Sequence, residues 1–142
     1  MKASLKPGIE YVHAFTIPEN KTVPHLYPEA EQFRSMPQVL ATGFMVGLME
    51  WACIEAIAPH LDEGEGSLGI HIDVSHVSAT PPGLTVCVSV QCIEVEGRRL
   101  TFKVSAHDGL DLIGEGRHQR MVVNWERFND KVAEKARRAK ND

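Results

Sequence analysis

Apolar residues are most concentrated in one central stretch, residues 41–58, which is followed by Pro59. From Gly43 to Met49 this stretch contains only glycine and apolar side chains, so it lacks the polar stripe of a surface helix. A helix that is apolar on all sides is typical of a buried position. The run is too short to cross a bilayer, for which about 20 apolar residues are needed. The pattern predicts a buried helix at the centre of a soluble domain.

Alternation of apolar and polar residues predicts five strands around this helix. Their approximate ranges are residues 9–17, 68–76, 86–92, 100–106 and 112–124. In the second of these strands His76 shares a face with four apolar residues, whereas His71 and Asp73 point to the opposite face. Tight turns at residues 80–83, 96–97 and 108–109 join the last four strands, so we expect these strands to be antiparallel neighbours.

A sheet that curls around one apolar helix buries the apolar surface of both. The predicted fold class is therefore α+β, with the hot-dog fold, a curved antiparallel β-sheet wrapped around one long buried central helix. Residues 1–130 are predicted to form this single domain, and residues 131–142 a charged C-terminal helix end or tail. Because the sheet leaves strand edges open, we expect a homodimer.

The irregular segment 21–38 carries three prolines and scattered apolar residues, which either cap the core or roof a ligand pocket.

Composition mainly excludes functions. A chain of 142 residues suits one domain with an adequate core. Its formal charge of −4 gives no sign of the positively charged surface that binds nucleic acid. The three cysteines, Cys53, Cys87 and Cys92, have no metal-ligand spacing, and an odd number without a leader sequence fits reduced thiols. We therefore expect a cytoplasmic protein with no metal, no cofactor, and no nucleic-acid or membrane partner.

Three polar residues are candidates for chemistry. Glu50 lies in the middle of the apolar helix, where it is either a structural acid with a partner or a catalytic carboxylate whose pKa is raised by desolvation. His76 is either a core histidine or a proton carrier next to that carboxylate. Thr42 is either the N-cap of the helix or a group that orients a substrate.

Helix geometry sets a limit on how these residues can meet. In one straight helix the Cα atoms of Thr42 and Glu50 are about 12 Å apart, too far for a hydrogen bond. Thr42 therefore either lies in the turn before the helix or meets Glu50 across the substrate or a dimer interface. A glutamate paired with a histidine fits hydrolysis, because the carboxylate can attack a carbonyl or activate water while the imidazole moves protons.

Several long runs resemble the fluoroacetyl-CoA thioesterases of the hot-dog superfamily, from about residue 8 to residue 131. The central run is Ala-Thr-Gly-Phe-Met-Val-Gly-Leu-Met-Glu-Trp-Ala-Cys at residues 41–53. Other matching runs lie at residues 21–29, 64–69, 79–86, 95–100 and 105–109. Runs of this length are far more specific than a short motif.

The resemblance implies roles for individual residues. The catalytic residues of the family fall on Thr42, Glu50 and His76. A glycine whose backbone N–H meets the thioester falls on Gly69, and a basic position that contacts the substrate falls on Arg120. The remaining substrate-binding residues form an apolar lid and are Val23, Leu26, Phe33 and Met36. Met36 stands where a family member carries phenylalanine beside the fluorine pocket, and methionine fixes the shape of a pocket less well than an aromatic ring.

By the same resemblance the protein is an acyl-CoA thioesterase. It hydrolyses fluoroacetyl-CoA, or a similar short acyl-CoA, to the free acid and CoA, in a detoxification or resistance role. The CoA thioester is the substrate, and no cofactor is implied. The alternatives are a general short-chain acyl-CoA thioesterase, a hot-dog hydratase or dehydratase, and a non-catalytic acyl-CoA-binding dimer.

Overall fold

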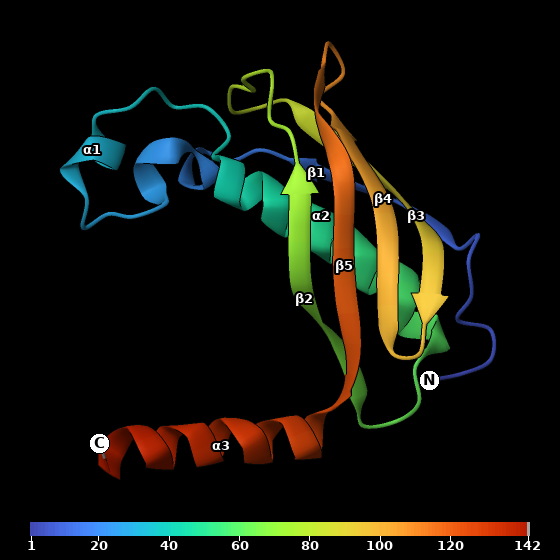
Figure 1. Cartoon of the computed structure of the whole chain (residues 1–142). Helices are drawn as coiled ribbons and strands as arrows, with labels where there is room; N and C mark the ends of the chain where they lie inside the picture. The colour runs from blue at the N-terminus through green and yellow to red at the C-terminus, as the bar shows by residue number, and fades with distance from the viewer. Residues whose placement is uncertain (142) are drawn as a thin grey trace.

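The protein folds as one antiparallel sheet laid over one long helix (Figure 1). The computed structural model describes residues 1–141. The five strands are β1 (Glu10–Thr16), β2 (Glu65–Val74), β3 (Thr85–Glu96), β4 (Arg99–His107) and β5 (Leu112–Asn124). They are ordered β1-β3-β4-β5-β2, and each neighbouring pair is antiparallel. The prediction that the last four strands are neighbours is wrong for β2, which pairs with β5 and not with β3, because residues 75–84 carry the chain across the sheet instead of forming a hairpin turn. Helix α2 (Thr42–Ile57) packs against one face of this sheet, as the apolar pattern predicts.

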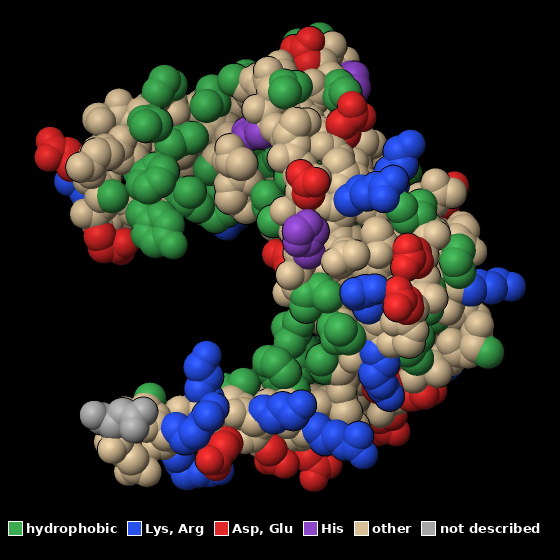
Figure 2. Space-filling view, viewed as in Figure 1, with side chains coloured by type: hydrophobic (Ala, Val, Ile, Leu, Met, Phe, Trp, Pro, Cys, Tyr) green, Lys and Arg blue, Asp and Glu red, His purple; other side chains and the backbone are tan. Residues whose placement is uncertain are grey.

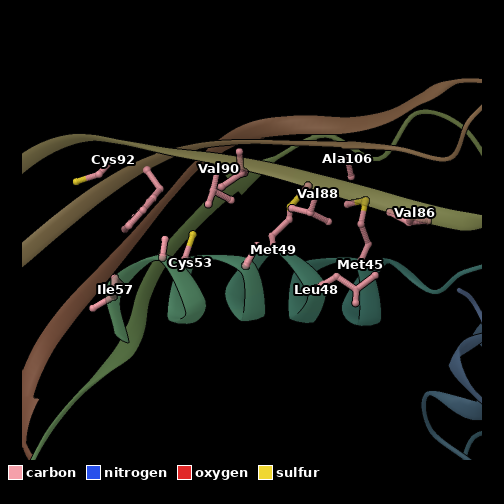
Figure 3. Packing of buried hydrophobic residues seen from close by; sticks show 14 of the residues in the cluster. Met45, Leu48, Met49, Cys53, Ile57, Val86, Val88, Val90, Cys92 and Ala106 are labelled. Atoms are coloured by element: carbon pink, nitrogen blue, oxygen red, sulfur yellow. The ribbon is translucent and has the colours of Figure 1, made fainter. Parts of the chain in front are cut away.

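The core lies between α2 and the inner face of the sheet. Figure 3 shows side chains of α2, among them Met45, Met49 and Cys53, pointing toward β3. On β3, buried and exposed residues alternate in the predicted register, so that Val88 and Val90 face the helix. Burial of each such side chain stabilises the fold by about 1.5–3 kcal/mol. This interface therefore fixes the position of α2, the element that carries two candidate catalytic residues.

The prediction that α2 is buried on all sides is wrong for the single chain. One face of the helix is buried, but Trp51 and Ile54 on the other are exposed. The reason is that the sheet covers only one side of the helix. The exposed apolar face is compatible with further packing that a single chain does not provide.

Strand β2 also departs from the predicted strict alternation. A bulge lies between Gly69, which pairs with Arg120, and His71, which pairs with Gln119. β2 is an edge strand, so Ile70 and Ile72 are exposed rather than directed into the core. The strand ends at Val74, and the predicted strand residue His76 lies in the segment that follows.

Two arms extend from the sheet on the side of the free β2 edge (Figure 1). One comprises the short helices η1 (Glu19–Lys21), η2 (Val23–His25) and α1 (Glu31–Arg34), and includes the predicted lid. The other is α3 (Trp125–Asn141), which has no buried residue. Figure 2 shows a wide open space between the two arms, with hydrophobic side chains on the upper arm and where the lower arm joins the sheet, and mainly Lys and Arg along the lower arm. Within residues 1–141 no helix is long and apolar enough to cross a membrane.

Candidate active site

Thr42 and His76 form a hydrogen-bonded pair. Oγ1 of Thr42 is 2.8 Å from Nδ1 of His76. The N-cap position of α2 is occupied by Ala41, and Thr42 is the first helical residue, so its hydroxyl does not cap the helix. The backbone N–H groups on either side of His76 donate to carbonyl oxygens of β5, at 2.9 Å from Ser75 and 2.7 Å from Val77. The sheet therefore holds the imidazole against the start of α2.

The second ring nitrogen of His76, Nε2, is buried and has no hydrogen-bond partner in the part of the chain that the structure describes. Burial lowers the pKa of His76, so the neutral imidazole is favoured at pH 7. His76 and Thr42 line a hollow together with apolar residues that include Val23 and Leu40. A neutral imidazole can accept a proton at its unpaired nitrogen, which the single chain shields from solvent.

Glu50 is held by a buried arginine. Its Oε1 atom is 3.1 Å from Nη1 of Arg120, which is 2% exposed. Arg120 also donates from Nε to Oγ of Ser67 and from Nη2 to the carbonyl oxygen of Ser67, both at 2.9 Å. The side chain of Glu50 is 41% exposed, so the prediction of a fully buried carboxylate is wrong for the single chain. Glu50 is an anchored carboxylate that opens to solvent.

Gly69 lies directly against this carboxylate. A Cβ atom built on Gly69 would be 2.6 Å from Oε1 of Glu50 and 3.1 Å from Cε1 of His118. Only a residue without a side chain therefore lets the backbone of β2 approach Glu50 this closely. Glu50, Gly69 and His118 line one hollow, together with His71.

Within one chain the candidate residues form two separate groups. Thr42 and His76 line one hollow, and Glu50 and Gly69 line another. Both Thr42 and Glu50 belong to α2, eight residues apart, which corresponds to about 12 Å along the axis. The possibility that Thr42 lies in a turn before the helix is therefore excluded. The remaining alternative is a meeting across the substrate or across a dimer interface.

Two predicted lid residues lie next to the start of α2. Val23 lines the hollow of Thr42 and His76. Leu26 packs over Gly43, where an added Cβ atom would be 3.2 Å from Cδ1 of Leu26. The lid thus contacts the helix at the residue that follows the candidate threonine.

The other two lid residues lie farther along the same arm. The ring of Phe33 stacks on that of Tyr27, with centroids 5.8 Å apart and an interplanar angle of 29°. Met36 follows α1, and about half of its surface, 48%, is exposed. The structure therefore gives Phe33 an aromatic partner and leaves Met36 partly exposed on the arm.

Sequence reasoning missed two members of the Glu50 group, Ser67 and His118. Ser67 fixes the guanidinium of Arg120, and Nε2 of His118 is 3.2 Å from Nη1 of the same guanidinium. A signal was available for His118, because residues 118 and 120 lie on one face of a strand. No group of three or more His, Cys, Asp and Glu side chains in residues 1–141 is arranged to hold a metal ion.

Comparison with known proteins places the chain in a family. A sequence profile of the family described as fluoroacetyl-CoA-specific thioesterase matches residues 21–126. The chain belongs to this family. It is 57% identical over 135 residues to a fluoroacetyl-CoA thioesterase from Streptantibioticus cattleyicolor, and the match covers 95% of this chain and 97% of that protein.

Solved structures agree with this assignment. One is a threonine-to-alanine variant of a fluoroacetyl-CoA thioesterase in complex with fluoroacetate. It matches with a TM-score of 0.90 at 56% identity, over 92% of this chain and 98% of that one. A hot-dog-like protein from Thermanaerovibrio acidaminovorans, 21% identical, matches with a TM-score of 0.77 over 91% of each chain, which supports the fold alone.

Two sequence predictions are thereby confirmed, the hot-dog fold and the class of thioester hydrolase. The roles of single residues stay predictions, as do the homodimer and the boundary at residue 130.

Proposed function

We propose that this protein hydrolyses fluoroacetyl-CoA to fluoroacetate and CoA. The observation that carries the proposal is the carboxylate of Glu50, which is anchored through Oε1 by Arg120 in an open hollow. Family membership and the 57% identical fluoroacetyl-CoA thioesterase support the substrate. A related enzyme was solved with fluoroacetate, the acid that this hydrolysis releases.

The reaction breaks the bond between the acyl carbon and sulfur and adds water across it. In our proposal Glu50 attacks the carbonyl carbon or directs the water that does so. If Glu50 directs water, His76 takes a proton from that water and returns it to the leaving sulfur. If Glu50 attacks, an anhydride forms as the thiolate leaves, and His76 then takes a proton from the water that hydrolyses the anhydride, which restores Glu50 and protonates the thiolate. Thr42 and the N–H of Gly69 orient the thioester and stabilise the developing oxyanion.

This mechanism needs the two groups of residues to meet, and a homodimer provides the means. The free edge of β2 carries exposed Ile70 and Ile72, and such an edge is a natural site of pairing with a second chain. In Figure 1 the start of α2, which carries Thr42, extends past this edge toward the open side. A second copy paired there therefore receives Thr42 and His76 of the first copy beside its own Glu50.

The predicted lid sets the acyl preference in this proposal. Val23 and Leu26 lie against the start of α2, and the same arm carries Phe33, stacked on Tyr27, and the exposed Met36. The exposed and flexible Met36 favours a second candidate, a general short-chain acyl-CoA thioesterase. Arg120 is occupied by Ser67 and Glu50, so in our proposal it acts on the substrate through Glu50.

The proposed biological role is detoxification, because hydrolysis destroys the activated poison before metabolism uses it. We propose a cytoplasmic location, which the three free cysteines Cys53, Cys87 and Cys92 support. A hydrolase of this kind needs no cofactor, since water and the thioester are its only reactants.

The decisive experiment measures release of free thiol by the purified protein from fluoroacetyl-CoA and acetyl-CoA in parallel. Preferential release from the fluorinated substrate supports the proposal, and equal release from both makes the protein a general short-chain thioesterase. If neither substrate releases thiol, an enoyl-CoA is tested next: its hydration without thiol release indicates a hydratase, and binding of acyl-CoA without any turnover indicates an acyl-CoA-binding dimer. Either of the last two outcomes overturns the proposed function.

A further inference from the structure

His118 is only 2% exposed, and each of its ring nitrogens lies within hydrogen-bond distance of a polar atom. It lies on β5, on the same face as Arg120. Its Nδ1 atom is 2.7 Å from the carbonyl oxygen of His71 on β2, and its Nε2 atom is 3.2 Å from Nη1 of Arg120. The imidazole thus bridges the β2 backbone and the guanidinium that holds Glu50.

Only one form of the imidazole satisfies both contacts. The carbonyl oxygen of His71 can only accept a hydrogen bond, so Nδ1 must carry the proton. The guanidinium of Arg120 can only donate, so Nε2 must present its lone pair. The other neutral tautomer and the imidazolium both set an N–H of His118 against an N–H of Arg120. His118 is therefore neutral and protonated on Nδ1.

This arrangement completes the hydrogen bonding of the atom that touches Glu50. Nη1 of Arg120 has two hydrogens, of which one points to Oε1 of Glu50 at 3.1 Å and the other to His118. Ser67 fixes the opposite side of the guanidinium through Nε and Nη2. Loss of the acceptor on His118 removes a constraint at the end of the arginine that meets the carboxylate.

We propose that His118 is a positioning residue for the thioesterase reaction, which holds Nη1 of Arg120 so that the guanidinium fixes the reacting carboxylate of Glu50. The inference rests on the role of Glu50 in the proposed function. It also gives a purpose to the bulge in β2, which lies between Gly69 and His71, because bulges re-aim groups beside active sites. The carbonyl of His71 that receives Nδ1–H belongs to the first residue after this bulge.

The charges around His118 maintain this state. Three groups face it, Arg120 on its own strand, His71 on β2 and Glu50 on α2. Burial lowers the pKa of His118, and the cation of Arg120 lowers it further, whereas the hydrogen bond to the carbonyl of His71 and the charge of Glu50 raise it. The balance keeps the imidazole neutral at pH 7.

A matched pair of substitutions tests the inference, because each keeps one of the two hydrogen bonds. His118→Gln places an amide oxygen near the position of Nε2 and keeps an acceptor for Arg120. His118→Asn places an amide nitrogen near the position of Nδ1 and keeps only the donor to His71. A hydrogen bond to a charged group is worth enough to change kcat by about 10- to 100-fold. We expect His118→Asn to lower kcat by this factor with little change in KM, and His118→Gln to retain most of the activity.

The thermal midpoint of each variant shows whether it is folded, and only folded variants are compared. Equal loss in both variants, or no loss in either, overturns the inference. A second readout uses the protein without substrate, namely the 15N chemical shifts of labelled histidine at pH 7. They are expected to show Nδ1 protonated and Nε2 unprotonated in His118, and the opposite tautomer or an imidazolium contradicts the inference. Since this measurement does not depend on turnover, it separates failure of the inference from failure of the proposed function.

Discussion

Oε1 of Glu50 lies 3.1 Å from Nη1 of Arg120, although the two residues are 70 positions apart in the chain. The contact joins the middle of α2 to β5. The arginine is buried, whereas the carboxylate is 41% exposed. One oxygen of Glu50 is therefore committed to the fold, and the side chain still faces the hollow in which a substrate can bind.

Replacement of Glu50 by glutamine is expected to abolish most of the turnover. The amide keeps the size of the side chain and can still accept a hydrogen bond from Arg120, but it is neither a nucleophile nor a base. We expect a fall in kcat of about 100-fold or more, since a general base alone contributes about 10²–10⁴-fold. Thiol release from fluoroacetyl-CoA measures the effect. Unchanged turnover in the folded variant removes Glu50 from the mechanism.

Substitution of Arg120 by lysine is expected to affect both stability and activity. Lysine keeps the charge but loses the planar fork that reaches Ser67 and Glu50 together. Loss of such buried hydrogen bonds costs about 1–3 kcal/mol in the free energy of unfolding. Urea denaturation measures this cost, and steady-state kinetics are expected to show a fall mainly in kcat. Arg117→Lys, on an exposed position of the same strand, is the matched control and should change neither quantity.

Substitution of Gly69 by alanine tests the close approach of β2 to the carboxylate. The added Cβ atom would lie 2.6 Å from Oε1 of Glu50, so the carboxylate has to move. Because the side chain of Glu50 is partly exposed, it can shift without unfolding the protein. We expect a fall in kcat of about 10- to 100-fold with a small change in stability.

The matched control for this substitution is Gly47→Ala in the same region of the fold. An added Cβ atom on Gly47 meets nothing within 4 Å, and alanine in a helix is more stable than glycine by about 1 kcal/mol. The control is therefore expected to be as active as the parent and slightly more stable. If Gly69→Ala is fully active as well, the contact with Glu50 does not matter for turnover.

Mildly acid pH is expected to weaken the fold through two histidines that are wholly or partly buried. The pKa values of His76 and His118 are both lowered from the ordinary value of 6.5, chiefly by burial. Below pH 6.5 the unfolded chain therefore binds more protons than the folded one, and the free energy of unfolding falls as the pH falls. The slope is at most about 1.4 kcal/mol per pH unit for each histidine.

The effect of the histidines on stability can be separated from that of Glu65 by the choice of pH. Glu65, whose pKa is lowered to about 2 by the N-terminal ammonium group, contributes only at more acid pH. Urea denaturation between pH 5 and 6.5 thus reports mainly on the histidines. His118→Gln is expected to reduce the slope in this window, and an unchanged slope contradicts the assignment. Because neutral His76 is the proposed base, turnover is expected to persist below pH 6.5 until this imidazole is protonated.

The regular elements could be predicted from the sequence, but the contacts of the site could not. The alternation in β3 and the apolar run of α2 result from burial against each other, so both leave a periodic signal. The bulge after Gly69 leaves none, because one extra residue changes the register without changing the composition. A prediction that omits this bulge places His76 on the inner face of a strand, whereas His76 lies beyond the end of β2.

Pairs that are distant in the chain were beyond sequence reasoning for a similar reason. The hydrogen bond between Thr42 and His76 and the ion pair of Glu50 with Arg120 depend on how α2 crosses the sheet. The apolar neighbours of Glu50 made it a candidate in the sequence. It gave no means of knowing that a buried arginine anchors it, because periodicity describes faces of elements and not the partners across them.

Substitution of Met36 by phenylalanine is expected to sharpen the preference for the fluorinated substrate. Met36 is 48% exposed on the lid arm, near the stacked rings of Phe33 and Tyr27, so a larger ring can be accommodated without strain in the core. A rigid aromatic ring defines a pocket better than a flexible thioether, and one well-placed apolar contact changes discrimination by about tenfold. We therefore expect the ratio of kcat/KM for fluoroacetyl-CoA to that for acetyl-CoA to rise by about this factor. Val12→Phe, at another exposed apolar position on β1, is the control and should leave the ratio unchanged. If Met36→Phe leaves the ratio unchanged too, residue 36 does not contact the acyl group, and selectivity has to arise in the hollows beside Thr42 and Glu50.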